Sequence, residues 1–171
     1  MEGMVWQRLE SLARRLSPLL ITVLFSMASV MPLHIPGLAP VAPALSLMAV
    51  YYWAIFRPDL LPAPLVFVAG VFQGVLSGLP LGVEALVLVS AFGIVSSQRR
   101  FFLGKSFVVM WWGFLLVAAG ALSATWVMVS ALRGAVIDPS PVLLELVMTL
   151  ALFPFVTWIL VRAQRGLLRQ I

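Results

Sequence analysis

The sequence predicts an all-α membrane protein with six transmembrane helices and both termini in the cytoplasm. Three observations lead to this prediction. Of the 171 residues, 63% are hydrophobic and 10% are charged, whereas soluble domains contain about 45–50% apolar and about 25% charged residues. The apolar residues fall into six runs that are separated by turn residues and charges. The basic residues lie at the ends of these runs, where they act as topology signals.

Composition also limits the function classes. The chain has no cysteine, which excludes disulfides, thiolate metal sites and cysteine nucleophiles. Its net charge of +5 does not indicate a nucleic-acid partner, because the basic residues form no continuous stripe. We expect one integral membrane domain over residues 1–171. It would comprise a cytoplasmic amphipathic N-terminus (1–15), a six-helix bundle (16–161) and a basic cytoplasmic tail (162–171).

The first predicted span covers residues 16–32. Before it, Val5, Leu9 and Leu12 share one helical face. Two interpretations fit this N-terminal segment: a short helix in the cytoplasmic interface, or a frayed terminus whose charges set the topology. The loop after the first span carries His34, the only histidine, to which we assign no metal or catalytic role because it lacks suitable neighbours.

The second predicted span, residues 38–56, is interrupted by Pro40 and Pro43. An uninterrupted apolar run remains only from 44 to 56, although a span needs ~20 residues. The Pro-rich part therefore either fills the outer half of the membrane as irregular chain or folds back. Irregular backbone is tolerated at that depth only where protein or water covers it.

Four more spans are predicted at 60–76, 83–97, 107–132 and 142–161. With six spans, Arg133 is the only one of the 11 Lys and Arg residues on the outer side, which agrees with the positive-inside rule. The aromatic runs Tyr51-Tyr52-Trp53 and Trp111-Trp112 lie near predicted cytoplasmic span ends. We interpret them as interfacial aromatic residues.

The stretch GVFQGVLSGLPLGVEALV is expected to be the packed centre of the protein. It contains Gly70, Gly74 and Gly78 at spacings of four residues, followed by a tight turn with Pro80 and Gly82. Glycines at this spacing leave a groove in which another helix can approach closely. We predict that these five residues, the glycine seam, form a close helix contact within the protein or with a partner. Ordinary tolerance of glycine in membrane helices is the alternative.

Polar residues inside the predicted spans form a second candidate site. Gln73, Glu84 and Glu145 each lie a few residues from an outer span end, and Arg133 lies in the outer loop above them. We predict that these four residues converge in the outer half of the membrane. The cluster is either a cation or proton site or an interhelical hydrogen-bond network, and we favour the network.

The cytoplasmic side carries a third group of candidate residues, which are expected to set the topology or to contact inner partners or anionic lipid: Arg99, Arg100, Lys105, Arg162 and Arg165. No H-E-x-x-H, G-x-S-x-G or phosphate-binding glycine motif is present in the sequence. The sequence therefore predicts a protein that is not an enzyme and needs no metal or cofactor.

Short motifs spread over nearly the whole chain carry a family resemblance: Ala42-Pro43, Leu47-Met48-Ala49-Val50-Tyr51-Tyr52-Trp53, Arg57-Pro58, Gly70-Val71-Phe72-Gln73, Leu76-Ser77-Gly78-Leu79-Pro80-Leu81-Gly82, Ala85-Leu86, Ser97-Gln98-Arg99-Arg100 and Ala163-Gln164-Arg165. In these the chain resembles the rod shape-determining protein MreD family of the bacterial inner membrane. That family commonly has an Asp at the position of Gly74, so an essential role for that carboxylate does not carry over.

The resemblance implies a non-enzymatic scaffold of the machinery that elongates the cell wall of rod-shaped bacteria. Its expected partners are MreC, MreB, RodA with its partner penicillin-binding transpeptidase, and membrane lipid. The implied fold is similar to the substrate-binding subunits of energy-coupling-factor transporters, and the glycine seam would hold the single membrane helix of MreC. The alternative function is a small-solute transporter or a membrane-embedded substrate-binding subunit, with the outer polar cluster as its site.

Overall fold

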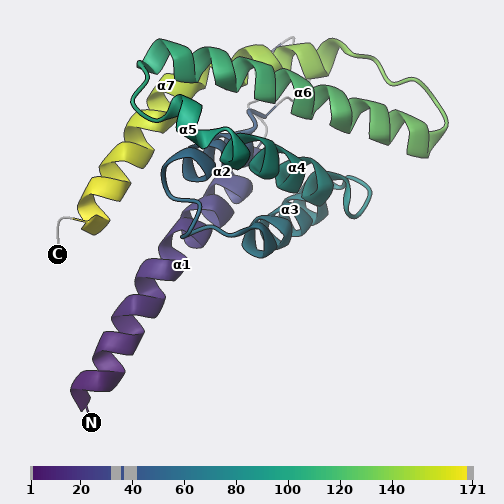
Figure 1. The fold of residues 1–171 in the computed structure, drawn as a ribbon. Coiled ribbons are helices and arrows are strands. Elements are labelled where there is room, and N and C mark those ends of the chain that lie inside the picture. Colours follow the sequence, from purple (N-terminus) through teal and green to yellow (C-terminus); the bar gives the residue numbers. More distant parts are fainter. Residues whose placement is uncertain (1, 32–35, 37–41, 169–171) are drawn as a thin grey trace.

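Figure 1 shows the computed structural model of the chain, which describes residues 2–31, 36 and 42–168. The predictions for His34 and Pro40 lie outside the described residues. Within those residues the chain forms helices and no strand: α1 (Glu2–Val30), α2 (Leu45–Phe56), α3 (Ala63–Ser77), α4 (Val83–Ser97), α5 (Arg99–Phe102), α6 (Phe107–Arg133) and α7 (Ser140–Leu168).

Each of the six predicted apolar runs overlaps one of the longer helices, and α4 agrees with its prediction at both ends, whereas α1 and α7 extend well beyond their runs. Three described helices, α1, α6 and α7, are long and apolar enough to cross a membrane. Helices α2, α3 and α4 have 12, 15 and 15 residues, which is shorter than the ~20 residues of a typical span. The one-turn helix α5, inside the basic loop, was not predicted.

Helix α2 is the centre of the molecule. All residues from Ser46 to Ile55 are buried, because the surrounding helices cover every side of α2 (Figure 1). A helix that is hydrophobic all round is buried in this way. The stretch from Gly70 to Val87, which was predicted to be the packed centre, forms the closely packed α3–α4 pair, in which α3 also contacts α1 and α4 also contacts α2.

The aromatic residues of α2 connect it to its neighbours. The Tyr51 hydroxyl donates to the Met110 carbonyl of α6 at 2.9 Å, and its ring meets Phe114 edge-on with centroids 5.2 Å apart. Phe114 also stacks on Phe153 of α7, with centroids 4.3 Å apart. The interfacial interpretation of Tyr51-Tyr52-Trp53 is therefore wrong, because these side chains are at most 2% exposed.

Helix α1 runs without a break across the predicted boundary between residues 15 and 16. Pro18 removes the N–H that would bond the Arg14 carbonyl, and the Ser17 hydroxyl donates to that carbonyl at 2.8 Å instead. The helix therefore continues across the end of the N-terminal segment, for which the sequence left open a short interfacial helix or a frayed terminus. Its inner face carries small polar residues, among them the buried Thr22 and Ser26, which bond to carbonyls of their own helix.

A proline also interrupts the hydrogen bonding of α7. Pro154 cannot donate to the Leu150 carbonyl, and the Trp111 indole of α6 donates to that oxygen at 3.3 Å. Figure 1 shows α7 changing direction between its green and yellow parts, as expected for a helix with an internal proline.

Different segments of the chain lie at the two ends of the molecule. Figure 1 shows both chain termini and α5 at the left, whereas the turns at 78–82 and 134–139 lie at the right. We call the latter the outer end, after the predicted orientation.

Candidate functional site

Gly70 lies where α3 and α4 approach most closely. A Cβ built on Gly70 would lie 2.5 Å from the Ala85 Cα and 2.9 Å from the Ala85 nitrogen. Both atoms belong to the backbone of α4, so they cannot move aside as a flexible side chain can. Only glycine fits at this position, and this is the close packing that small residues allow between membrane helices.

The other residues of the glycine seam have different surroundings. A Cβ on Gly74 would lie 3.7 Å from the Glu84 Cβ, which is an ordinary contact. Gly78 and Gly82 adopt φ values of +67° and +92°, which glycine tolerates best, and they bound the turn that contains Pro80. The groove predicted for a partner helix is therefore filled by α4 of the same chain.

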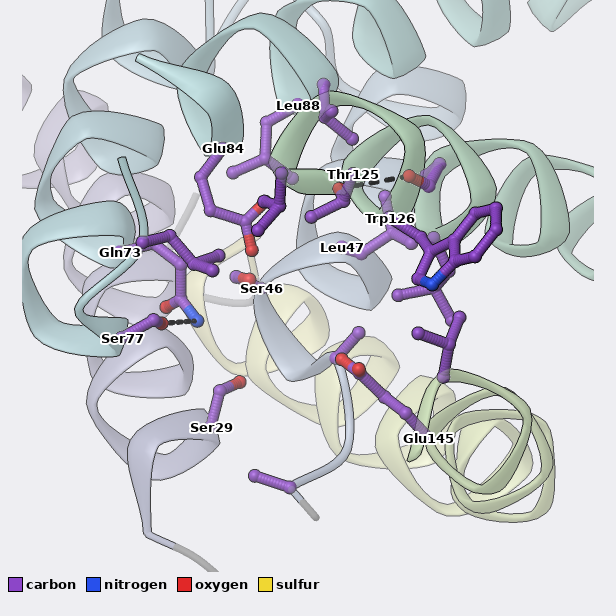
Figure 2. Close-up of a pocket in the computed structure, with 18 of the residues that line it drawn as sticks. Ser29, Ser46, Leu47, Gln73, Ser77, Glu84, Leu88, Thr125, Trp126 and Glu145 are labelled. Carbon is purple, nitrogen blue, oxygen red and sulfur yellow. Dashed lines mark hydrogen bonds between the residues drawn. The ribbon is translucent and has the colours of Figure 1, made fainter. Parts of the chain in front are cut away.

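A pocket of about 480 Å³ lies at the outer end. We call it the outer pocket, and Figure 2 shows its lining residues. Gln73, Glu84, Arg133 and Glu145 all line it. The structure thus places the four residues of the predicted polar cluster around one space, with Arg133 exposed and the other three buried or half-buried.

Figure 2 shows the Glu84 carboxylate and the Glu145 carboxylate directed into the pocket from opposite walls, α4 and α7. Glu84 lies in the first turn of α4, where the positive end of the helix dipole favours a carboxylate. The Gln73 amide, on α3, lies near Glu84 and donates to the Ser77 hydroxyl at 3.3 Å.

The floor of the outer pocket is the irregular chain before α2. Two backbone N–H groups at its junction with α2 bond to side chains. Ala44 N donates to the Thr149 hydroxyl at 3.0 Å, and the N–H of Leu45, the first residue of α2, donates to the Ser29 hydroxyl at 3.0 Å. Thr149 in turn donates to the Glu145 carbonyl at 2.6 Å. These bonds hold α1, α2 and α7 together and satisfy backbone groups that irregular chain leaves free.

Sequence reasoning missed the hydroxyl residues that line the outer pocket, namely Ser29, Ser46, Ser77 and Thr125. A signal for Ser29 was present in the sequence. Thr22, Ser26 and Ser29 are spaced by four and three residues, so they share one face of α1. Small polar residues at this spacing are typical of helix contacts in membranes.

A second hollow, of about 630 Å³, lies between α4 and α6 and is mostly apolar. We call it the α4–α6 groove. Small residues from both helices line it, namely Ser90, Ala91, Gly113, Gly120, Ala121 and Ala124. Gly120 and Ala124 are exposed, and a Cβ on Gly120 would meet no atom within 4 Å. This groove could not be recognised from a spacing motif in the sequence, because two separate helices, α4 and α6, supply most of its residues.

The basic candidates lie at the end opposite the outer pocket, on α5 and its following loop and near the end of α7. Lys105 lies over the Phe101 ring with its Nζ 5.5 Å from the centroid, and the Arg162 guanidinium lies 4.7 Å from the centroid of Trp158. Arg100 and Arg165 are exposed, and Arg99 is half-buried. Such cations over aromatic rings are typical of residues at a membrane interface.

Comparison with protein families gives one match. The family of the rod shape-determining protein MreD matches residues 11–163. That range reaches from the first half of α1 to the last turns of α7, so it contains the outer pocket and the α4–α6 groove. Searches of curated proteins and of solved structures found no match.

Proposed function

Because this chain belongs to the MreD family of rod shape-determining proteins, we propose that it is a non-enzymatic scaffold of the machinery that elongates the bacterial cell wall. The observation that carries this proposal is the family match over residues 11–163. Family membership indicates a part in rod shape determination. The proposed partners are MreC, RodA with its penicillin-binding transpeptidase, and MreB.

The proposed arrangement is multi-pass in the inner membrane, with six spans and both termini in the cytoplasm. The six longer apolar helices support it, as does the position of both termini at the end that carries most basic residues (Figure 1). The short helices α2, α3 and α4 would cross with the help of irregular segments, of which residues 42–44 before α2 are buried or half-buried. Short helices and a Pro-rich lead also suit the proposed similarity to substrate-binding subunits of energy-coupling-factor transporters.

We place the membrane helix of MreC in the α4–α6 groove and not on the glycine seam. The seam is filled by α4, whereas the groove presents exposed small residues on α6. Helices associate in lipid through close packing at small residues, so an exposed groove of this kind favours a single helix as its occupant. The large apolar side chains at its rim, Leu86 at 55% and Leu116 at 74% exposure, add contact area.

The basic residues at the opposite end form the proposed cytoplasmic contacts. Arg99, Arg100 and Lys105 lie on one loop, and Arg162 and Arg165 lie near the end of α7. Each basic residue near an anionic leaflet contributes about 1 kcal/mol of attraction. This is enough to hold the inner face at the membrane, where MreB would meet it.

A co-purification experiment tests the groove. Gly120→Leu fills the groove, whereas Gly93→Leu places the same side chain on an exposed glycine of α4 that does not line it. Neither glycine has an atom within 4 Å of a built Cβ, so both variants should fold. We expect the Gly120→Leu variant to retain less than about a tenth of the MreC that the wild type retains, as for loss of ~1.4 kcal/mol or more, and Gly93→Leu to retain it fully. Equal retention by the two variants would place MreC elsewhere.

A further inference from the structure

Two carboxylates in the outer pocket lack a cationic partner. Glu84 and Glu145 are half-buried, and the ion pair that the described part of the chain contains joins Arg57 to Asp59, in the α2–α3 connection. Arg133 lines the same pocket but makes no ion pair with either glutamate. Both carboxylates face the pocket, and the described residues give neither of them an ion pair, so a cation in the pocket would gain charge-assisted hydrogen bonds from both.

Gln73 gives a second, independent sign of a missing ligand. Its side chain is 6% exposed and lines the outer pocket. Its Nε2 donates to Ser77, whereas its Oε1 is buried and has no hydrogen-bond partner among the described residues. Buried polar atoms are nearly always hydrogen-bonded, so this oxygen is an acceptor without its donor. Figure 2 shows the amide on the same side of the pocket as the Glu84 carboxylate.

We propose that the outer pocket binds a small organic amine as its protonated primary ammonium ion, with Glu84 and Glu145 supplying the negative charge and Gln73 a neutral acceptor. A primary ammonium group has three N–H donors and no acceptor, which suits a pocket that is lined by two carboxylates and an amide. The apolar side chains of Leu47, Val87 and Leu88 line the same pocket and contact the organic part of the ligand.

The volume of the pocket and the number of coordinating side chains favour an organic amine over a bare metal ion. A volume of about 480 Å³ lies in the range of about 300–1,000 Å³ that holds small molecules. Within the described residues, no group of three or more His, Asp or Glu side chains is arranged to hold a metal ion. This binding function is separate from the proposed scaffold function, which does not depend on it.

Thermal unfolding of the wild-type protein in detergent tests the ligand chemistry without any mutation. A ligand that binds the folded state raises the melting temperature in a saturable way. We expect propylamine hydrochloride to do so, and equal concentrations of propanol with sodium chloride, or of tetramethylammonium chloride, to have at most a third of the effect. An equal effect of all three, or none from propylamine, would overturn the proposal and leave a hydrated pocket or a proton site.

Charge-neutral variants then test the residues. Glu84→Gln and Glu145→Gln should each raise the half-saturating propylamine concentration by about tenfold or more, as expected for a lost charge-assisted hydrogen bond. Glu10→Gln removes an exposed glutamate on α1 and should leave it unchanged. Unchanged propylamine binding by folded Glu84→Gln and Glu145→Gln proteins would overturn the assignment. If either variant fails to fold, the melting temperatures of the wild-type protein with propylamine and the control solutes still test the proposal.

The ammonium group could come from a soluble amine or from an aminophospholipid headgroup. Native mass spectrometry with added phosphatidylethanolamine or phosphatidylglycerol distinguishes these sources. Selective retention of phosphatidylethanolamine, lost on adding propylamine, identifies the headgroup as the ligand. Propylamine binding that phosphatidylethanolamine does not displace identifies a soluble amine. Equal retention of both lipids, with no competition from propylamine, argues against an ammonium site.

Discussion

Two glycines, Gly70 on α3 and Gly120 on α6, have opposite surroundings. At Gly70 the backbone of α4 occupies the space in which a Cβ would lie. At Gly120 that space is empty, and the residue lines the exposed α4–α6 groove. The same residue type therefore closes one helix contact and leaves another open. A small-residue motif in a membrane helix therefore predicts that another helix packs closely against it. The motif does not show whether that helix belongs to the same chain or to a partner.

The largest expected effect is at the closed contact. Gly70→Ala forces a methyl group against the α4 backbone and should lower the free energy of unfolding by about 3 kcal/mol. Gly74→Ala, four residues along the same helix, places its methyl group 3.7 Å from the Glu84 Cβ and should change it by less than about 1 kcal/mol. Unfolding in mixed detergent micelles, followed by tryptophan fluorescence, measures both. Similar losses for the two variants would mean that α3 and α4 do not cross at Gly70.

An intermediate effect is expected where the groove meets the core. A Cβ on Gly113 would contact the Phe102 ring and the Tyr51 hydroxyl, which are side-chain groups and can shift. Gly113→Ala should therefore cost about 1–2 kcal/mol, less than Gly70→Ala. The same unfolding assay tests this order. A loss as large as that of Gly70→Ala would show that the core around Tyr51 is as rigid as the backbone contact.

A small effect is expected at the open groove. Gly120→Ala adds a methyl group that meets no atom within 4 Å, so the free energy of unfolding of the isolated protein should stay the same or rise by up to about 1 kcal/mol, because alanine favours the helix over glycine. The assay is again detergent unfolding, without partners. A loss above about 1 kcal/mol would mean that the groove is closed in the folded protein.

The smallest effect concerns an exposed contact outside both regions. Asp138 accepts hydrogen bonds from the Ser140 nitrogen at 3.0 Å and the Ser140 hydroxyl at 2.8 Å, and these bonds lower the pKa of Asp138 below its ordinary value. The contribution to stability is present above the ordinary pKa and is lost as the pH falls through the lowered value. Wild type and Asp138→Ala should therefore differ slightly in melting temperature at pH 7. At a pH far below the lowered pKa, their melting temperatures should be equal. A difference that grows on acidification would contradict this.

The positions of the helices could be predicted from the sequence because apolar runs and turn residues define them locally. The runs ending at Phe56 and beginning at Phe107 match helix ends within a residue. The central place of α2 could not be predicted in this way. Burial on all sides depends on which helices surround it, and the aromatic residues Tyr51 and Trp53 fit an interface as well as a core by composition.

The candidate site was predicted in part for the same reason. Ionisable residues inside apolar runs are rare, so Glu84 and Glu145 stand out, and a common depth in the membrane predicts that they meet. The structure places both around one pocket. The groove at Gly113 and Gly120 was missed because these glycines are seven residues apart and their neighbours come from α4. A single-helix spacing motif cannot reveal a surface that two helices form together.

The most direct test of the account is crosslinking to MreC from single cysteines, since the natural chain contains none. A photoreactive maleimide would be attached at Gly120→Cys in the α4–α6 groove or at Val75→Cys, which is 60% exposed on α3 beside Gly74. We predict a crosslinked MreC product from Gly120→Cys and none from Val75→Cys. A product from Val75→Cys alone would contradict the account, because it would place the partner on α3 and leave the groove without one.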